Sequence, residues 1–336
     1  MAGGSKVAVY AAIVANVAVT SAKLVGFLMT GSGTMLAETI HSFADVGNQS
    51  LLALGMHQAA QPASEDHPEG RGREAFLWAL VSAVGIFFLG CGVTVAHGVE
   101  VLLSHDTHEL GDMRVAIGIL VVSAIIEGGS FAVAVRELQH AAHERSQSLF
   151  EYVRTTDDPF GVAVLFEDGA AVLGVFVALA SLWLAQVFHE PRIDAVGSIA
   201  IGLILGALAI NLISRNRKYL VGRSVRVAER EQINAILSED PVVERVALTR
   251  AIVEGSSTFR VSAEVDFDGH ELARQYLAEH PVAELHASLT TPEELQVFLG
   301  DYSEDLMVAV GKEIDRLESK LAAALPGAEY IAIEPD

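Results

Sequence analysis

Cysteine and basic side chains are scarce in this sequence. Of its 336 residues only Cys91 is a cysteine, which excludes an intramolecular disulfide and a zinc-finger type of thiolate cluster. Lysine and arginine number 22 against 43 aspartate and glutamate residues, giving a formal net charge of −21. Because nucleic-acid binding needs clustered basic side chains, this balance argues against a nucleic-acid partner and favours cations as partners.

Charged residues of either sign are also few. They make up 19% of the chain while 51% is hydrophobic, and the mean hydropathy is +0.40. Soluble domains usually carry about 25% charged residues. Disordered chains lack the apolar area needed to offset ordering entropy, so this composition excludes a disordered protein. The chain must fold with a very large apolar surface.

Six long segments are almost free of charge, and each is near the roughly 20 residues that a helix needs to cross a bilayer. They cover residues 7–30, 35–57, 76–103, 115–135, 161–187 and 193–213. Six consecutive long helices without a polar face are unusual in a soluble core. We therefore expect a membrane α-helical protein, with a six-helix bundle in the lipid bilayer over residues 1–213. The first span is too long for the apolar region of a signal peptide, so we expect no cleavage there.

The basic residues of the short connections predict the orientation of the spans. Only Arg114 and Arg192 fall on one side. The other side carries Lys6, Arg71, Arg73, Arg136, Arg145, Arg154, Arg215, Arg217 and Lys218. We therefore expect the N-terminus and the C-terminal region of this multi-pass protein on the inner, cytosolic side. The membrane that we expect is a bacterial inner membrane.

After residue 213 the composition becomes that of a soluble α+β domain, which we expect over residues 214–336. The expected elements are a helix at 228–237, strands at 242–253 and 259–267, a long amphipathic helix at 304–324 and a strand at 330–334. In the second strand Val261, Ala263 and Val265 alternate with polar residues, which predicts one buried face. This order suggests a small sheet with helices on one face. Residues 269–300 resemble an insertion with one or two short helices.

Ionisable residues within a span are costly to place there, so each is a candidate functional residue. His41 and Asp45 are four residues apart in the second span, which puts both on one helix face. Their nitrogen and oxygen atoms could converge on one metal ion. The alternative is a His–Asp hydrogen bond that only joins helices. The spacing leaves both open, because two ligands do not complete a tetrahedral site.

The fifth span carries two adjacent carboxylates, Glu167 and Asp168. They would repel one another unless a cation lay between them or they pointed to different environments. A second possibility is that Glu167 is solvated near the inner interface, leaving only Asp168 as a ligand. His41, Asp45 and Asp168, with Glu167 or water as fourth donor, would form a nitrogen and oxygen site without sulfur. Such a site suits zinc first, and also cobalt, nickel, iron or manganese.

Other intramembrane polar residues are weaker candidates for a metal site. Lys23 and Asn16 in the first span, and Glu127 with Ser130 in the fourth, could form buried pairs that join helices. Single polar groups of the third span are expected to be packing residues, and acids and histidines of the loops are expected to be solvated. These residues are His97 and Cys91 in the span, and His105, Asp106, His108, Glu109, His140 and His143 outside it.

Several stretches of the sequence together match a known family in the expected order. They are Ala37–Asp45, Leu51–Gly55, Leu165–Gly174, Gly222–Ser224 and Ala263–Gly269. The chain resembles the cation diffusion facilitator family over its whole length, most closely the zinc transporter nine branch. The resemblance implies a homodimer of six-helix protomers with a ferredoxin-like cytosolic domain. It implies a transporter without a cofactor, not an enzyme, which exports divalent metal from the cytosol in exchange for protons.

The resemblance also assigns roles to residues. It makes His41 and Asp45 one metal-binding pair, and Asp168 one member of a second pair. The position four before Asp168 is Val164, which cannot ligate, so Glu167 looks like the replacement. We expect His41, together with Asp45, to exchange metal for protons, since imidazole titrates near neutral pH.

Two departures from the family pattern bear on other metal sites. In the run Asp66–Arg71, Arg71 stands where the family often has a second histidine, and an arginine cannot bind a cation. The last strand lacks the histidines that often hold regulatory zinc, so the C-terminal domain is expected to serve dimerisation.

Alternatives to a zinc exporter remain open. One is an exporter of manganese, iron or cobalt. Another is an intramembrane metallohydrolase, although no His-Glu-x-x-His motif is present. The third is a membrane scaffold whose C-terminal domain recruits partners.

Overall fold

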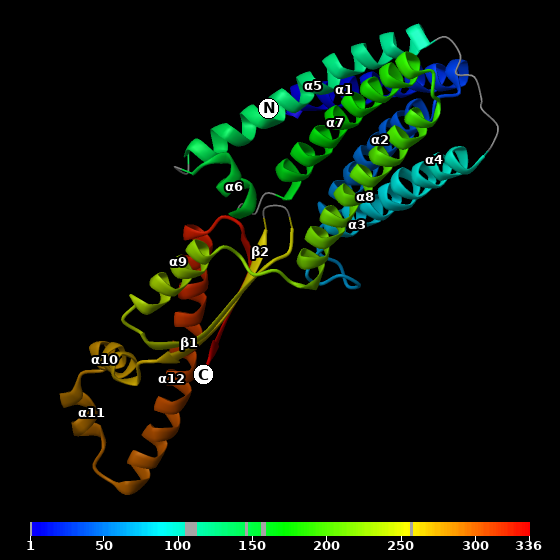
Figure 1. The fold of residues 1–336 in the computed structure, drawn as a ribbon. Helices are drawn as coiled ribbons and strands as arrows, with labels where there is room; N and C mark the ends of the chain where they lie inside the picture. Colours follow the sequence, from blue (N-terminus) through cyan, green and yellow to red (C-terminus); the bar gives the residue numbers. More distant parts are fainter. Residues whose placement is uncertain (1, 105–112, 145–146, 156–158, 256–257) are drawn as a thin grey trace. The chain divides into compact units, whose positions relative to one another are not determined.

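The computed structural model describes residues 2–104, 113–144, 147–155, 159–255 and 258–336. Its internal contacts divide the chain into two units, Met1–Val221 and Gly222–Asp336. Figure 1 shows helices in the first unit, and a small sheet with helices in the second.

All secondary-structure elements among the described residues of the first unit are helices. Its elements are α1 (Ala2–Thr30), α2 (Gly33–Ala59), α3 (Glu74–Gly85), η1 (Ile86–Val93), α4 (Thr94–Leu103), α5 (Met113–Glu144), α6 (Leu149–Thr155), α7 (Pro159–Phe188) and α8 (Arg192–Val221). The π-helical segment η1 joins α3 and α4 without a break, so residues 74–103 form one long helix. Between α1 and α2, Gly31 adopts a φ of +66°, a backbone conformation that glycine adopts readily.

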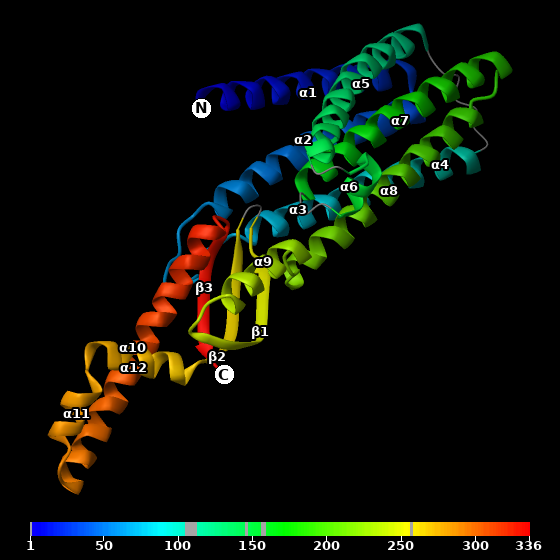
Figure 2. The same cartoon turned by 90° about the vertical axis from the view of Figure 1, so that its left-hand side faces the viewer.

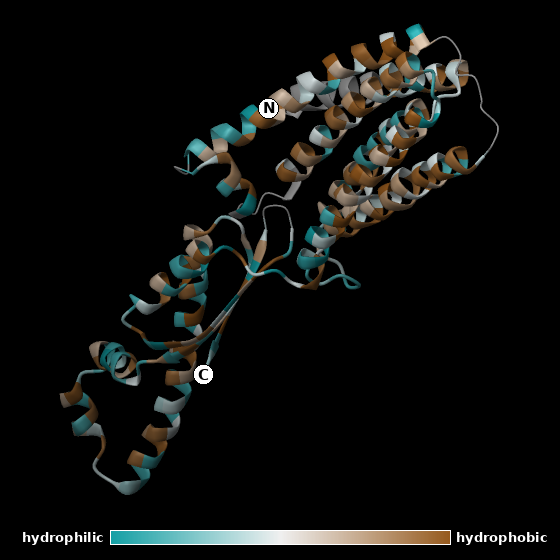
Figure 3. Cartoon of the chain, viewed as in Figure 1, coloured by the Kyte–Doolittle hydropathy of each residue, from teal (hydrophilic) through white to brown (hydrophobic). Residues whose placement is uncertain are grey.

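By length and composition, four helices among the described residues could cross a membrane. They are Glu74–Leu103, Met113–Glu144, Gly161–Phe188 and Arg192–Val221. Asn16–Thr30 of α1 forms a shorter apolar helix. Helix α2 is not among the four, and it carries Glu38, His41 and Asp45. Figure 3 shows apolar residues along most of the helices of the first unit.

Helix α2 is packed between other helices of the first unit. It contacts α1, α3, α7 and α8, and α5 packs against α7 and α1. The apolar core includes Met35, Leu120, Val175, Leu182, Ile201 and Leu205. Helices in lipid associate through close packing at small residues. At Gly202 of α8 a Cβ atom would lie only 2.8 Å from the Val95 side chain. Glycine thus permits the close approach of α8 to α4.

The second unit is an α+β fold with its own core. Its elements are α9 (Val227–Ser238), β1 (Val243–Val253), β2 (Phe259–Phe267), α10 (Gly269–Glu279), α11 (Val282–Ser288), α12 (Pro292–Ala324) and β3 (Ala328–Pro335). The sheet has the order β1-β2-β3, with β2 antiparallel to β1 and parallel to β3 (Figure 2). Val261, Ala263 and Val265 are buried, as their alternation predicted, together with Leu317 and Leu321 of α12.

Helices α5, α8 and α12 extend well beyond the segments predicted from the sequence. Helix α5 continues to Glu144 and α8 to Val221, because polar residues prolong a helix after its apolar part ends. The predicted start of the long helix at residue 304 is wrong, since α12 begins at Pro292. Thr291 caps it: the Thr291 hydroxyl accepts from the Glu294 N–H, and the Glu294 carboxylate accepts from the Thr291 N–H. The stretch 269–300 therefore holds α10, α11 and the first turns of α12.

Candidate metal site

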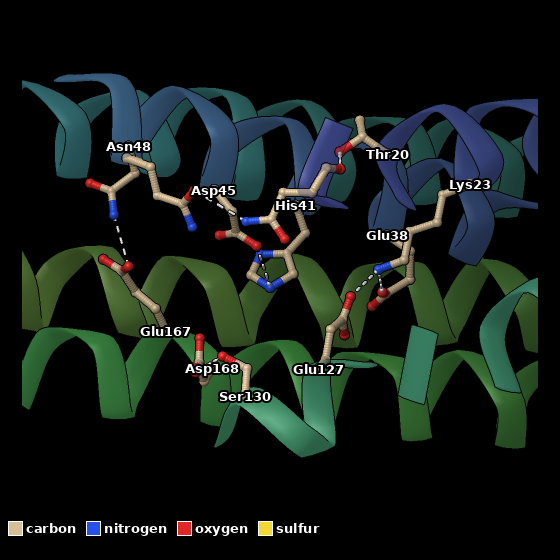
Figure 4. A network of polar contacts seen from close by, with 12 residues as sticks. Thr20, Lys23, Glu38, His41, Asp45, Asn48, Glu127, Ser130, Glu167 and Asp168 are labelled. Atoms are coloured by element: carbon tan, nitrogen blue, oxygen red, sulfur yellow. Dashed lines mark hydrogen bonds and ion pairs between the residues drawn. The ribbon is translucent and has the colours of Figure 1, made fainter. Parts of the chain in front are cut away.

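Polar side chains follow one face of α2. Glu38, His41, Asp45 and Asn48 are three or four residues apart, which places them one above the other on the helix. Figure 4 shows this row beside Lys23 of α1, Glu127 of α5 and two carboxylates of α7.

His41 and Asp45 form the central pair of the row. His41 Nε2 lies 3.6 Å from an Asp45 carboxylate oxygen, which is longer than a hydrogen bond. His41 is 1% exposed, and neither ring nitrogen has a hydrogen-bond partner among the described residues. Both residues lie on α2, so a contact between them cannot join two helices. A buried imidazole without a partner is energetically costly, and a ligand would relieve that cost.

The two carboxylates of α7 point to different neighbours, one of the arrangements that the sequence left open. The Asn48 side-chain amide donates to Glu167 at 2.8 Å, and Ser82 donates to the Asn48 oxygen at 2.6 Å. The Ser130 hydroxyl donates to Asp168 at 2.7 Å. Glu167 is therefore tied to α2 and α3, whereas Asp168 is tied to α5.

The predicted ligands do not form a coordination shell in this structure. Within the described ranges, no group of three or more His, Cys, Asp or Glu residues is placed to hold a metal ion. The structure brings His41 close to Asp45, while Glu167 and Asp168 have other hydrogen-bond partners. A site with four protein ligands would require both α7 carboxylates to leave these partners.

Lys23 forms a buried ion triad that the sequence analysis did not identify. Its ammonium lies 2.7 Å from a Glu38 oxygen and 2.7 Å from a Glu127 oxygen. The side chains of Lys23 and Glu38 are 0% exposed. The triad joins α1, α2 and α5, so the prediction that Lys23 and Glu127 join helices is confirmed. The sequence analysis did not name Glu38 as a member of a buried pair, although its position three residues before His41 places it on the same face of the helix.

The remaining polar candidates have ordinary partners. Asn16 joins helices, since its amide donates to Gln49 of α2 at 3.1 Å. Ser130 binds Asp168 and not Glu127. His140 is exposed beside Glu144. A guanidinium nitrogen of Arg71 lies 3.4 Å from a ring nitrogen of His67. The candidates Asp106 and Glu109, and with them His105, His108 and Arg145, lie outside the described residues.

A second buried carboxylate missed in the sequence fixes the start of α2. Asp194 of α8 is 2% exposed and accepts from the Ser32 hydroxyl at 2.9 Å. It also accepts from the Gly33 N–H at 2.5 Å, the Thr34 hydroxyl at 2.5 Å and the Thr34 N–H at 3.3 Å. A negative charge here also interacts favourably with the positive end of the α2 dipole.

Comparison with known proteins gives the family. A family model described as the cation efflux transmembrane domain matches residues 9–221, which is more than half of the chain. The chain belongs to the cation efflux family. The family relation expected from the sequence is thereby confirmed, and the protein is a multi-pass membrane protein.

Several relatives match most of the chain in sequence. The proton-coupled zinc antiporter SLC30A9, mitochondrial, of Homo sapiens is 35% identical over 315 residues, covering 93% of this chain and 55% of that protein. The chain thus spans about half the length of this relative. Metal tolerance protein C4 of Arabidopsis thaliana is 34% identical over 336 residues, covering 98% and 73%. The cation-efflux pump FieF of Shewanella oneidensis is 26% identical over 266 residues, covering 79% and 83%. The names of the antiporter and the efflux pump describe transport and not catalysis.

Proposed function

We propose that the protein transports a divalent metal ion, with zinc as the favoured cargo, and exchanges it for protons. The observation that carries the proposal is the buried His41 imidazole, which lies 3.6 Å from the Asp45 carboxylate and has no hydrogen-bond partner among the described residues. The name of the human relative, a proton-coupled zinc antiporter, supports the same cargo and coupling.

The proposed ligand set is His41, Asp45 and Asp168, with Glu167 or water as the fourth donor. In the structure the Asn48 amide donates to Glu167, and the Ser130 hydroxyl donates to Asp168. A divalent ion attracts these carboxylates more strongly than a neutral amide or hydroxyl does. Metal binding would therefore draw the α7 carboxylates toward α2.

Proton exchange follows from the chemistry of these ligands. A metal ion binds neutral imidazole and ionised carboxylate, so its arrival displaces any proton that His41 or Asp45 holds. Protons arriving from the opposite side would in turn favour metal release. Alternating exposure of the pair to the two sides would make this exchange vectorial.

The proposed transporter has six spans, formed by α1, α2, the continuous helix 74–103, α5, α7 and α8. We propose a homodimer in a bacterial inner membrane that exports metal from the cytosol. Both termini and the C-terminal unit, with a ferredoxin-like architecture, would lie in the cytosol. The basic residues of the connections support this orientation.

A flux assay in proteoliposomes tests the site. We expect His41→Ala and Asp45→Ala to abolish zinc uptake driven by a pH gradient, because each removes a ligand. His97→Ala is the matched control, since His97 is a partly buried histidine on α4 outside the row. Unchanged zinc flux in His41→Ala, with its pH dependence intact, would show that the assignment is wrong.

A broader cargo is the second candidate, and Glu167 favours it. A carboxylate in place of an imidazole adds a hard oxygen donor, which suits manganese and iron better than a histidine does. We expect manganese to compete with zinc, and Glu167→His to weaken that competition. Equal competition in both proteins would place Glu167 outside the ligand set.

A further inference from the structure

The first unit has two ends that the structure distinguishes. Asp194, at the start of α8, binds Gly33 and Thr34 at the start of α2, so α2 and α8 run in the same direction. We call this the Asp194 end. At the other end α8 finishes at Val221 and leads into the C-terminal unit, and we call this the Val221 end.

The Lys23 triad lies between His41 and the Asp194 end. Glu38 precedes His41 by three residues on the same face of α2, and Thr34, bound to Asp194, precedes Glu38 by four. Figure 4 shows Lys23, Glu38 and Glu127 on one side of His41, with Asp45 on the other. A cation that moved along this face from His41 toward the Asp194 end would meet the triad first.

Burial differs on the two sides of His41. The side chains of Lys23 and Glu38 are 0% exposed and that of His41 is 2% exposed. Asp45, one turn toward the Val221 end, is 24% exposed. Among these side chains Asp45 is the most exposed, Glu127 of the triad is 16% exposed, and Asn48, next along the row, is buried again. The face is thus covered between His41 and Glu38 and partly open at Asp45. The covering consists of three helices that one ammonium group holds together.

We propose that Lys23 is the barrier residue of the proposed transporter, closing the path between the metal site and the Asp194 end. Its two ion pairs hold α1 and α5 against α2 and so keep the three helices closed around the path. The inference rests on the proposed function, since it concerns access to the site at His41 and Asp45. Lys23 is a positioning residue here, because it acts on access and does not ligate the metal.

The strength of this closure follows from the burial of the charges. When one partner of a buried ion pair is removed, the remaining charge is left uncompensated, which is strongly destabilising. Without Lys23, Glu38 and Glu127 would be two carboxylates facing one another across α2 and α5, and like charges repel. Opening at the Asp194 end would separate α1, α2 and α5 and so break the ion pairs of Lys23. We therefore expect Lys23→Met to raise the population of this open state by about tenfold or more.

Thiol labelling from each side of the membrane tests the barrier. The reporter is Ser42→Cys in a Cys91→Ala background, because Ser42 is buried beside His41 and four residues after Glu38. A membrane-impermeant maleimide is applied to each side of sealed vesicles in turn. Protease cleavage of the C-terminal unit identifies the side of the Val221 end. We expect Lys23→Met to raise the labelling rate from the Asp194 end by at least about tenfold.

Two variants separate the barrier from general damage. Thr20→Val is the matched control on α1, because the Thr20 hydroxyl donates to the Asn16 carbonyl of its own helix and, within the described part of the chain, to no other helix. It should label as the parent does. Lys23→Arg restores a cation and should return labelling from the Asp194 end toward the parent rate. If Lys23→Met does not fold, Glu127→Gln takes its place, because it removes one of the two ion pairs. It should raise the labelling rate from the Asp194 end, by less than the about tenfold increase expected for Lys23→Met.

The result that overturns the proposal is labelling from the Asp194 end that is equal in the parent and in the folded Lys23→Met or Glu127→Gln variant. This failure is distinct from failure of the proposed function. Zinc binding and zinc flux by the wild-type protein test the function, whereas the labelling ratio between variants tests only the barrier. A wild type that transports zinc, with a Lys23→Met variant that labels as the parent does, would refute the barrier alone.

Discussion

Replacing Asp194 with alanine should destabilise the transmembrane unit more than most single substitutions do. The carboxylate accepts four hydrogen bonds from the start of α2, two from the backbone N–H groups of Gly33 and Thr34 and two from the hydroxyls of Ser32 and Thr34. It is 2% exposed, so water cannot replace it without opening the contact between α8 and α2.

The size of the effect can be worked out from these contacts. A buried donor left without its acceptor costs about 1–3 kcal/mol. Two backbone N–H groups would be left in this way, while the hydroxyls can rotate to other acceptors. The lost attraction between the charge and the helix terminus adds up to about 2 kcal/mol. We therefore expect Asp194→Ala to lower the free energy of unfolding by about 4 kcal/mol. Asp194→Asn keeps one acceptor oxygen and should cost about 2 kcal/mol.

Reversible unfolding in mixed micelles, as the denaturing detergent is increased, would measure these differences. Glu190→Ala is the control at the same end of α8, since Glu190 is exposed and accepts one weak bond from the Arg192 N–H. It should change the free energy of unfolding by less than about 0.5 kcal/mol. A loss below about 1 kcal/mol in Asp194→Ala would refute the reasoning, because α2 would then begin stably without this acceptor.

Two further predictions concern packing and pH. Gly202→Ala places a Cβ 2.8 Å from a side chain of α4 and should cost about 1–3 kcal/mol in the same unfolding assay. Gly118→Ala on α5 has open space and should be neutral or stabilising; equal losses would contradict the packing argument. In the C-terminal unit, hydrogen bonds from Arg316, followed by one from Lys320, lower the pKa of Asp240 to about 2. Asp240→Asn should therefore lower the free energy of unfolding by about 2 kcal/mol above pH 4, and this difference should vanish as the pH falls toward 2. Hydrogen exchange of residues 222–336 measures it. A difference that does not vary with pH would contradict the prediction.

The sequence predicted best what depends on neighbours along the chain. The strand at 259–267 was found with the ends that the structure has, because alternation is a local pattern with a period of two. The shared face of His41 and Asp45 follows in the same way from their spacing on one helix. The cap at Thr291 was also a local signal, and attention to it would have placed the start of α12 correctly.

Contacts between distant helices could not be predicted in this way. Glu167 binds Asn48, and Lys23 binds Glu127, across 119 and 104 residues of sequence. In a membrane the apolar pattern does not fix how one helix is rotated against another, because lipid and helix surfaces are equally apolar. The partners of buried charges therefore had to come from the structure. The metal ligands themselves stay a prediction.

Zinc binding by the purified protein tests the central claim most directly. We expect the wild type to bind zinc at a single site per protomer, and Asp168→Ala to bind it at least about tenfold more weakly, a difference of about 1.4 kcal/mol. His140→Ala, which changes an exposed histidine outside the row, should bind as the wild type does. Equal zinc affinity in the wild type, His41→Ala and Asp168→Ala would contradict the proposed site.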